Sequence, residues 1–252
     1  MSHWLLPKGR NGLARFGLKL THAPGRRVGG SMARRNLWRI GASPIESLNE
    51  HIEDAGVVAF DFDGTLTVRD SFTAFLKWRA GPARYNRGLI KLFPAAIAYV
   101  GHRNRGRIKA AAVREYLTGV PREQLEAEAR QFAEIMAPRL LRPDAVRTWR
   151  RWDQRRAKLV IVTASPDIVV APFARGLGAD LLIGTELAFD EHDRVAGGFV
   201  GANCRGPEKV RRLQAVFGSG IHLAAAYGDT SGDREMLAIA DEAGYQVFKE
   251  KP

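Results

Sequence analysis

Short apolar runs that end in polar residues recur along the chain from residue 57 onward. The first is Val57–Phe62, which reads Val-Val-Ala-Phe-Asp-Phe. Runs of four to eight residues of this kind predict strands that are buried on both faces of a parallel sheet. The other predicted strands cover residues 158–163, 180–183, 222–227 and 245–248.

Helical periodicity fills most of the gaps between these strands. The predicted helices cover residues 145–156, 168–177, 208–217 and 233–240. Alternation of strands and helices predicts an α/β fold with a doubly wound, Rossmann-like parallel sheet. The segment 186–200 carries a polar centre at 190–193, which predicts a β-hairpin.

About ninety residues between the first two strands show no strand pattern. Helices are predicted there at 72–79, 84–100, 105–117 and 122–136. Such a connection is too long for a simple crossover between neighbouring strands. We therefore expect residues 71–142 to form a helical cap, inserted into a core made of residues 46–70 and 143–252.

Basic residues are concentrated at the N-terminus. The formal net charge is +12, and nine of the 39 Lys and Arg residues lie in residues 1–45, which contain no Asp or Glu. Positions 46–252 hold the other 30 basic residues against 27 acidic ones. The basicity therefore belongs to a tail, and not to a folded face that binds nucleic acid.

The composition of this tail, rich in Gly, Ser, Pro and Arg, predicts that residues 1–45 are disordered. Four interpretations stay open. The tail binds an anionic surface, or it is a transit peptide, or residues 1–31 are untranslated with Met32 as the true start, or the tail has no function.

Membrane-spanning and disulfide-stabilised classes are not favoured. The longest apolar stretch, 89–100, is interrupted by Lys91 and Pro94 and is shorter than the roughly 20 residues that a transmembrane helix needs. Cys204 is the single cysteine, so an internal disulfide is excluded. We expect a cytoplasmic protein, with peripheral contact to the inner membrane surface through the tail or the cap as an open alternative.

Polar residues gather where the predicted strands end. Asp61 and Asp63 close the first strand, Thr163 closes the second and Asp229 follows the fourth. In open α/β sheets the carboxyl ends of the strands form the ligand-binding edge. Two carboxylates two positions apart face the same side of an extended chain, and Gly64 permits a tight turn whose amides face an anion.

The segment 228–233, Gly-Asp-Thr-Ser-Gly-Asp, brings Asp229 and Asp233 to the same edge. Three or four carboxylates at one place repel each other strongly unless a cation binds between them. Oxygen donors without a cluster of histidines favour magnesium over zinc. The sequence therefore predicts a Mg²⁺ site.

Four motifs make the chain resemble the haloacid dehalogenase-like (HAD) phosphohydrolases. The first motif of that family, Asp-x-Asp-x-Thr, is matched at 61–65, and the second, a Thr at the end of the next core strand, is matched by Thr163. The third, a Lys near a helix start, is matched by Lys209, and the fourth, Gly-Asp-x-x-x-Asp, is matched at 228–233. All four occur in order within residues 57–248, each on the expected element. The resemblance implies a phosphatase with a HAD core and a cap.

The resemblance also implies a role for each motif residue. Asp61 is expected to be the nucleophile that forms an aspartyl-phosphate, and Asp63 to protonate the leaving oxygen and then activate water. Family members that act as dehalogenases lack this second Asp, so its presence favours phosphoryl chemistry. Mg²⁺ is expected to be bound by Asp61, by the carbonyl of Asp63 and by Asp229, with Asp233 in support. The phosphate is expected to be bound by Gly64, Thr65, Thr163 and Lys209. Lys209 is also expected to act as a catalytic residue that neutralises negative charge.

The position of the cap resembles subfamily IB of that family, which contains phosphoserine phosphatases and a bacterial phosphatidylglycerophosphate phosphatase, phosphatidylglycerophosphatase C. The lipid-phosphate branch is similar in Asp-Gly-Thr-Leu at 63–66, Thr-x-Ser-Pro at 163–166 and Cys-x-Gly-x-Glu-Lys at 204–209. Its cap is more hydrophobic than residues 88–101. The resemblance implies a phosphorylated small molecule or lipid head group as substrate, with phosphatidylglycerophosphate as the lead.

Phosphoserine is the alternative substrate. Phosphoserine phosphatases have Ser where this chain has Gly64, and they carry a cap Arg that is displaced by one position here, to Arg114. One step along a helix turns a side chain by about 100°. Asp70 falls where those enzymes have an acid for the substrate amino group. A hypothesis of another class is a non-enzymatic binding protein that uses the basic tail.

Overall fold

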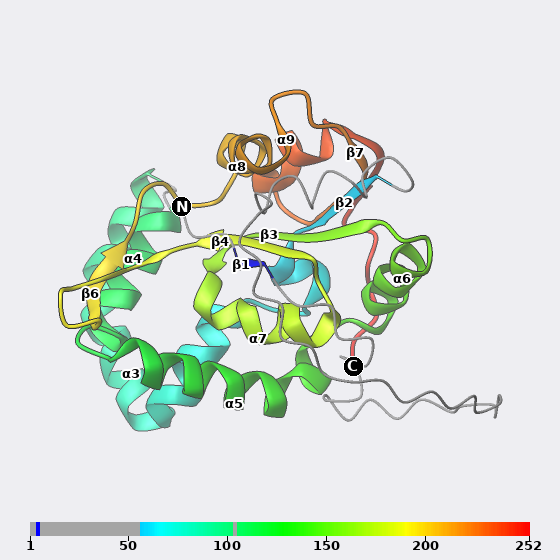
Figure 1. The fold of residues 1–252 in the computed structure, drawn as a ribbon. Helices are drawn as coiled ribbons and strands as arrows, with labels where there is room; N and C mark the ends of the chain where they lie inside the picture. The colour runs from blue at the N-terminus through cyan, green and yellow to red at the C-terminus, as the bar shows by residue number, and fades with distance from the viewer. Residues whose placement is uncertain (1–3, 6–55, 103–104) are drawn as a thin grey trace, which may run out of the picture.

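A mostly parallel sheet forms the centre of the molecule. The computed structural model describes residues 4–5, 56–102 and 105–252. Within these ranges six strands pair in the order β1-β4-β3-β2-β7-β8 (Figure 1). Five of them run parallel and β1 is antiparallel at one edge, which confirms the predicted fold class. The strands are β1 (Trp4–Leu5), β2 (Val57–Phe60), β3 (Lys158–Pro166), β4 (Leu181–Thr185), β7 (Leu223–Gly228) and β8 (Ala240–Tyr245).

The predicted tail lies almost wholly outside the described residues. Its expected disorder, and the expected start of the core at residue 46, therefore stay predictions. Trp4 and Leu5 are the exception, because they pair with Leu182 and Leu181 of β4. The composition of the tail did not predict that pairing.

Helices cover both faces of the sheet, as Figure 1 shows for α8 and α9 on one side and α7 on the other. Alternate strand residues supply the two faces: Val57 and Ala59 pack on the side of α8, whereas Val58 and Phe60 pack on the opposite side. This alternation follows from the two-residue period of a strand. The core helices are α6 (Pro143–Gln154), α7 (Asp167–Leu177), α8 (Pro207–Phe217) and α9 (Arg234–Leu237).

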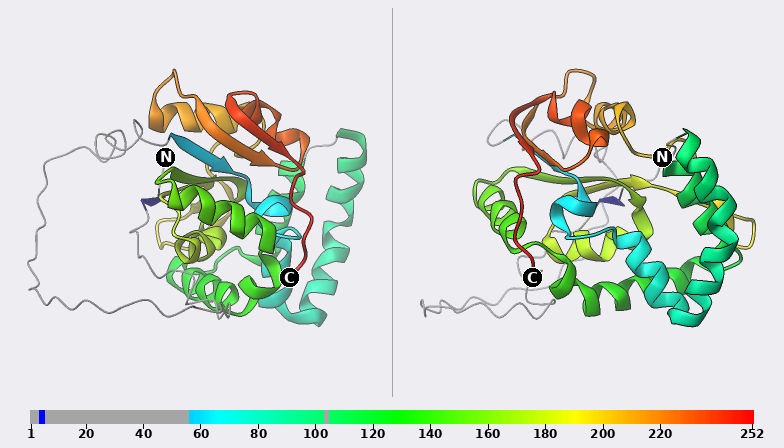
Figure 2. Two further views of the ribbon diagram at one scale, coloured as in Figure 1. Left: turned by 90° about the vertical axis from the view of Figure 1, so that its right-hand side faces the viewer. Right: turned by 180° about the vertical axis from the view of Figure 1, so that it is seen from behind.

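A group of helices lies between β2 and β3 in the chain (Figure 2), and we refer to it as the cap. It consists of α3 (Ser71–His102), α4 (Arg105–Tyr116) and α5 (Arg122–Leu140). The helices expected at 72–79 and 84–100 are the two parts of α3, separated at Gly81, where φ is +70°. No helix within the described ranges is both long enough and apolar enough to cross a membrane.

The chain enters and leaves the cap at neighbouring positions. Thr67 and Leu141 form an antiparallel bridge, Val68 N–H donates to Leu140 O at 2.8 Å, and Arg142 N–H donates to Leu66 O at 2.9 Å. We call this pair of segments, 66–68 and 140–142, the stalk.

The cap also packs directly on the core. Phe132 of α5 contacts Phe75 of α3 and Phe173 of α7, with ring centroids 5.4 Å and 5.9 Å apart. One continuous hydrophobic cluster includes all three rings. Burial of apolar surface therefore holds the cap against the sheet, in addition to the stalk.

The predicted hairpin is confirmed as β5 (Leu187–Phe189) and β6 (Val195–Phe199). It extends from the core to the cap loop at residues 119–122, where Gly119 N–H donates to Val195 O at 2.9 Å. The Arg122 guanidinium stacks 3.6 Å from the Phe189 ring centroid and pairs with Asp193 at 2.7 Å. The hairpin therefore braces the cap on the side away from the stalk.

The last strand and helix differ from the prediction. The helix expected at 233–240 is short, because the chain forms a 3-10 turn at Ser231–Asp233, then α9, and is already in β8 at Ala240. The strand expected at 245–248 was wrong: β8 ends at Tyr245. Most of β8 is exposed at the sheet edge, so it has no apolar run, whereas Phe248 follows the strand and packs on Phe60 and Tyr227.

Candidate active site

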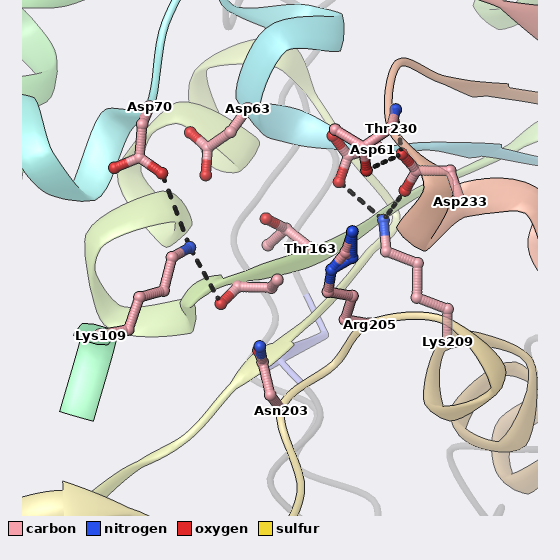
Figure 3. A pocket seen from close by; sticks show the side chains of 11 residues that line it. Asp61, Asp63, Asp70, Lys109, Thr163, Asn203, Arg205, Lys209, Thr230 and Asp233 are labelled. Atoms are coloured by element: carbon pink, nitrogen blue, oxygen red, sulfur yellow. Dashed lines mark hydrogen bonds and ion pairs between the residues drawn. The ribbon is translucent and has the colours of Figure 1, made fainter. Parts of the chain in front are cut away.

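The predicted site residues converge at the carboxyl edge of the sheet (Figure 3). Asp61 directly follows β2, and Asp229 directly follows β7. Thr163 lies within β3 and not at its end, because β3 continues to Pro166 after a register shift beyond Val162. Parallel pairing of β3, β2 and β7 places these positions side by side.

A tight turn after β2 carries the first two acids. Asp61 N–H donates to Tyr227 O at 2.9 Å, which joins the turn to β7. Gly64 has φ of +84°, a conformation that favours glycine. A Cβ at Gly64 would overlap the Asp229 carboxylate. A glycine is therefore needed here both for the backbone and for the close approach of the two acidic loops.

Lys209 is the charged centre of the site. Its ammonium donates to Asp61 Oδ1 at 2.7 Å, to Asp233 Oδ1 at 2.7 Å and to Val162 O at 2.6 Å. Lys209 is only 1% exposed, so it needs all three partners. The side chain is anchored near the start of α8, as the motif predicted.

Burial and neighbouring charges have opposite effects on the pKa values of Asp61 and Lys209. Burial raises the pKa of Asp61 to about 7, and the ammonium of Lys209 opposes that rise. Burial alone would lower the pKa of Lys209, but Asp61 and Asp233 together raise it above its ordinary value. Lys209 therefore stays protonated, and additional positive charge near Asp61 would favour its carboxylate form.

Asp63 has a separate set of partners. Its Oδ1 accepts the Ser71 N–H at 2.7 Å, and its Oδ2 accepts a short hydrogen bond from the Ser165 hydroxyl. Burial raises the pKa of Asp63, the Asp70 carboxylate raises it further, and Lys109 and the two serines oppose these effects. A carboxyl group held in place with a raised pKa has the properties of a general acid.

The loop after β7 completes the acidic cluster. Asp233 Oδ2 accepts from both the N–H and the hydroxyl of Thr230 at 2.9 Å. Asp229 Oδ1 is buried and has no hydrogen-bond partner among the described residues. Burial also raises the pKa of Asp229, and Asp233 adds to the rise. An unpartnered buried carboxylate oxygen is costly, so a cation is expected beside it.

The donor set fits a hard divalent cation. Asp61, Asp229 and Asp233 each offer an oxygen, and these oxygens lie within 4.8 Å of one another. Oxygen donors alone suit Mg²⁺. Asp233 already accepts hydrogen bonds from Lys209 and Thr230, and its supporting role at the metal stays a prediction. The side chain of Asp63 points away from this cluster, so its expected contribution to a metal is limited to its carbonyl.

A small pocket of about 110 Å³, lined mostly by charged and polar residues, opens beside the acids, between core and cap. The predicted residues Asp61, Asp63, Thr163, Lys209 and Asp233 line it. Gly64 and Thr65 do not line it, and the buried Thr65 hydroxyl has no partner among the described residues. The other residues that line the pocket are Asp70, Lys109, Ala164, Asn203, Arg205 and Thr230.

Lys109 was not among the predicted site residues. It extends from cap helix α4 to the core, where its Nζ lies 3.2 Å from Ser165 Oγ, 3.4 Å from Ala164 O and 3.6 Å from Asp70 Oδ2 (Figure 3). In the sequence it is one basic residue in a helix with several, and only the packing of the cap shows which one faces the site. Asn203 and Arg205 were also missed, because they lie in the loop before α8, where Asn203 precedes the pattern at 204–209 and Arg205 occupies one of its variable positions.

Comparison with known proteins identifies the family. The sequence profile of haloacid dehalogenase-like hydrolases matches residues 58–238. Over 222 residues, 88% of its length, the chain is 60% identical to the complete Protein CicA of two Caulobacter vibrioides strains. The chain therefore belongs to the haloacid dehalogenase-like hydrolases, and the predicted family and enzyme class are confirmed.

Solved structures share the fold at low identity. A protein of unknown function from Bordetella pertussis Tohama I has a TM-score of 0.59 at 24% identity, over 72% of this chain and 85% of that one. A substrate-bound phosphoserine phosphatase complex has a TM-score of 0.52 at 21% identity, over 73% and 82%. A HAD family hydrolase from Salmonella enterica serovar Typhi has a TM-score of 0.56 at 16% identity, over 80% and 71%.

Proposed function

We propose that the protein is a Mg²⁺-dependent phosphomonoester phosphatase with Asp61 as its nucleophile. The observation that carries the proposal is that two carboxylates with different hydrogen-bond partners line the same pocket. Asp61 is paired with an ammonium, whereas Asp63 is hydrogen-bonded to Ser71 and Ser165 and has a raised pKa. Such a difference separates a nucleophile from a general acid.

In the first step an Asp61 oxygen attacks phosphorus, and the bond from phosphorus to the ester oxygen breaks. Asp63 gives its proton to that leaving oxygen, so an alcohol departs and an aspartyl-phosphate remains. In the second step Asp63 takes a proton from a water molecule that attacks the same phosphorus. Phosphate leaves, and Asp61 is free again.

The other site residues have supporting roles. Lys209 and the Thr163 hydroxyl bind phosphoryl oxygens, and the amides of Gly64 and Thr65 are proposed to do the same. Asp61, Asp229 and the carbonyl of Asp63 would hold Mg²⁺, with Asp233 in support. When bound, the ion supplies positive charge that reduces repulsion between carboxylate and phosphate.

For the substrate, we propose phosphatidylglycerophosphate or a related phosphorylated metabolite, in a branch of subfamily IB. The pocket is small and most of the residues that line it are charged or polar, which suits a phosphorylated head group better than acyl chains. We also propose that the protein contacts a membrane surface through the cap or the tail, where such a lipid would be bound.

Phosphoserine is the second candidate, and one observation favours it. Asp70 and Lys109 place a negative and a positive charge side by side at the pocket, which suits a zwitterionic leaving group. Arg114, the displaced cap arginine, is exposed and does not line the pocket, so it would not bind the carboxylate.

Hydrolysis of p-nitrophenyl phosphate with and without Mg²⁺ tests the activity. We expect turnover that requires the metal, is lost in Asp61→Asn and survives deletion of residues 1–45. A rate that is independent of Mg²⁺ and unchanged in Asp61→Asn would reject the proposal and favour a binding protein. A panel of phosphate esters, with phosphatidylglycerophosphate and phosphoserine included, then separates the two candidate substrates.

A further inference from the structure

Arg205 reaches the pocket from the loop before α8. Its Nη2 donates to Ser231 Oγ at 3.0 Å, so the side chain lies across the turn that carries Asp229 and Asp233. Figure 3 shows the guanidinium directed toward Asp61, between Thr163 and Lys209. None of the four motifs contains this residue.

The other two cationic side chains that line the pocket, Lys209 and Lys109, both have carboxylate partners. Lys209 has two carboxylates at 2.7 Å, and Lys109 has Asp70 at 3.6 Å. No carboxylate of the described residues lies within ion-pair distance of Arg205, whose one side-chain hydrogen bond is to a neutral hydroxyl. An arginine that faces a pocket without an acidic partner has its donors available for an anion.

The turn at 229–233 leaves space for the Arg205 side chain at Gly232. A Cβ at Gly232 would lie 2.6 Å from Arg205 Cγ and 2.7 Å from its Cζ, and would also overlap Nη1. Gly232 is not among the residues with positive φ, so its backbone does not demand glycine. The absence of a side chain at position 232 therefore serves the placement of the guanidinium. A backbone hydrogen bond from Gly206 N–H to Gly232 O at 2.8 Å joins the same two loops.

We propose that Arg205 is a further phosphate-binding residue of this site, and that Gly232 is small so that Arg205 can reach the phosphoryl group. The inference rests on the proposed phosphatase function. The planar guanidinium donates to phosphoryl oxygens from the wall opposite the cap. It adds a positive charge that the Asp61–Lys209–Asp233 network does not supply.

Binding of inorganic phosphate to the full-length, Mg²⁺-loaded protein, measured by calorimetry, tests the proposal. We expect Arg205→Ala to raise the dissociation constant at least about tenfold and Arg205→Lys to raise it less. Arg151→Ala is the matched control, because Arg151 is an exposed arginine on α6, and it should leave the constant unchanged. Mg²⁺ affinity, titrated without phosphate, should be the same in all four proteins.

A double-mutant cycle tests the part played by Gly232. Gly232→Ala should weaken phosphate binding in the wild-type background and have no further effect in Arg205→Ala. Additive losses would show that Gly232 acts independently of Arg205 and would overturn its assigned role. Wild-type phosphate affinity in Arg205→Ala would overturn the role of Arg205. Failure of the wild-type protein to bind phosphate at all would instead count against the phosphatase proposal itself.

Discussion

The ammonium of Lys209 lies 2.7 Å from Asp61 Oδ1, although 148 positions separate the two residues in the chain. Both side chains are buried, and Asp233 shares the same ammonium. The contact joins α8 to the end of β2 through the middle of the site. The three side chains that hold these elements together are therefore also ones to which we assign roles in the proposed reaction.

Lys209→Met should be strongly destabilising, because it leaves Asp61 and Asp233 buried without a positive partner. Breaking a buried pair in this way costs about 3–5 kcal/mol of unfolding free energy. Urea unfolding at pH 7 measures the loss. Adding Asp233→Asn to Lys209→Met should recover part of it, since one uncompensated charge is removed. Equal stability of the single variant and the wild type would contradict the buried network.

The Ser165 hydroxyl should matter for turnover more than for stability. Ser165→Ala removes the hydrogen bond to Asp63 Oδ2, so we expect kcat to fall about tenfold as the acid loses its orientation. Ser71→Ala is the control, since Ser71 contacts Asp63 through its backbone N–H and its hydroxyl has no partner among the described residues. Steady-state kinetics on p-nitrophenyl phosphate compares the two. Equal effects of both substitutions would exclude the hydroxyl as the cause.

Gly64→Ala should remove activity by displacing Asp229, whose carboxylate occupies the position of the new Cβ. We expect at least about a hundredfold loss in kcat/KM, because the acidic loops must separate. Gly81→Ala is a matched control: Gly81 also has positive φ, but nothing lies within 4 Å of its Cβ position. It should lose some stability and keep its activity. Parallel measurement of Mg²⁺ affinity shows whether the Gly64 variant fails at the metal site.

Lys109→Met should change substrate preference more than general activity. Lys109 belongs to the cap and contacts Asp70 and Ser165 at the pocket, away from the Asp61–Lys209 pair. We expect kcat/KM to fall about tenfold or more for esters with an ionised leaving group, and severalfold at most for p-nitrophenyl phosphate. The ester panel measures both. A uniform loss on every ester would assign Lys109 to the chemical step.

Acid should destabilise α8 through Glu208, which pairs with two arginines of the same helix. This carboxylate accepts two hydrogen bonds from Arg211, at 2.6 Å and 2.7 Å, and one from Arg212 at 2.7 Å, and these lower its pKa to about 2 from an ordinary 4.5. Because the folded-state pKa is depressed, the stabilisation is complete above pH 4.5 and is lost as the pH falls toward 2. Glu208→Gln should therefore cost about 1 kcal/mol at pH 7, since solvent screens the Arg211 side of the group.

Urea unfolding at a series of pH values follows this difference. The difference in unfolding free energy between wild type and Glu208→Gln should become smaller below pH 4.5. Glu134→Gln, at an exposed position of α5, should show no gap at any pH. A constant gap for Glu208→Gln down to pH 3 would mean that its charge is not what stabilises α8.

Local patterns predicted the parallel sheet, the helices between β2 and β3 and the convergence of Asp61, Thr163 and Asp229. These features follow from periodicity and from the rule that parallel strands end at one edge. Three-dimensional packing decided the rest. Phe248 looked like part of a strand because it is apolar, but its burial comes from packing on Phe60 after β8 has ended. Lys109 became a site residue only because the cap folds over the pocket.

The stalk joins the two ends of the cap at one place on the core, which has a consequence for changes in the cap. Residues 66–68 and 140–142 leave the core side by side, so the whole cap is a cassette whose two ends nearly meet. Because the ends of the cap are joined by hydrogen bonds, we expect the strands of the core to keep their register when the length of the cap changes. A replacement cap would have to keep two contacts of the present one, the Ser71 N–H that holds Asp63 and the Phe132 ring that packs on Phe173.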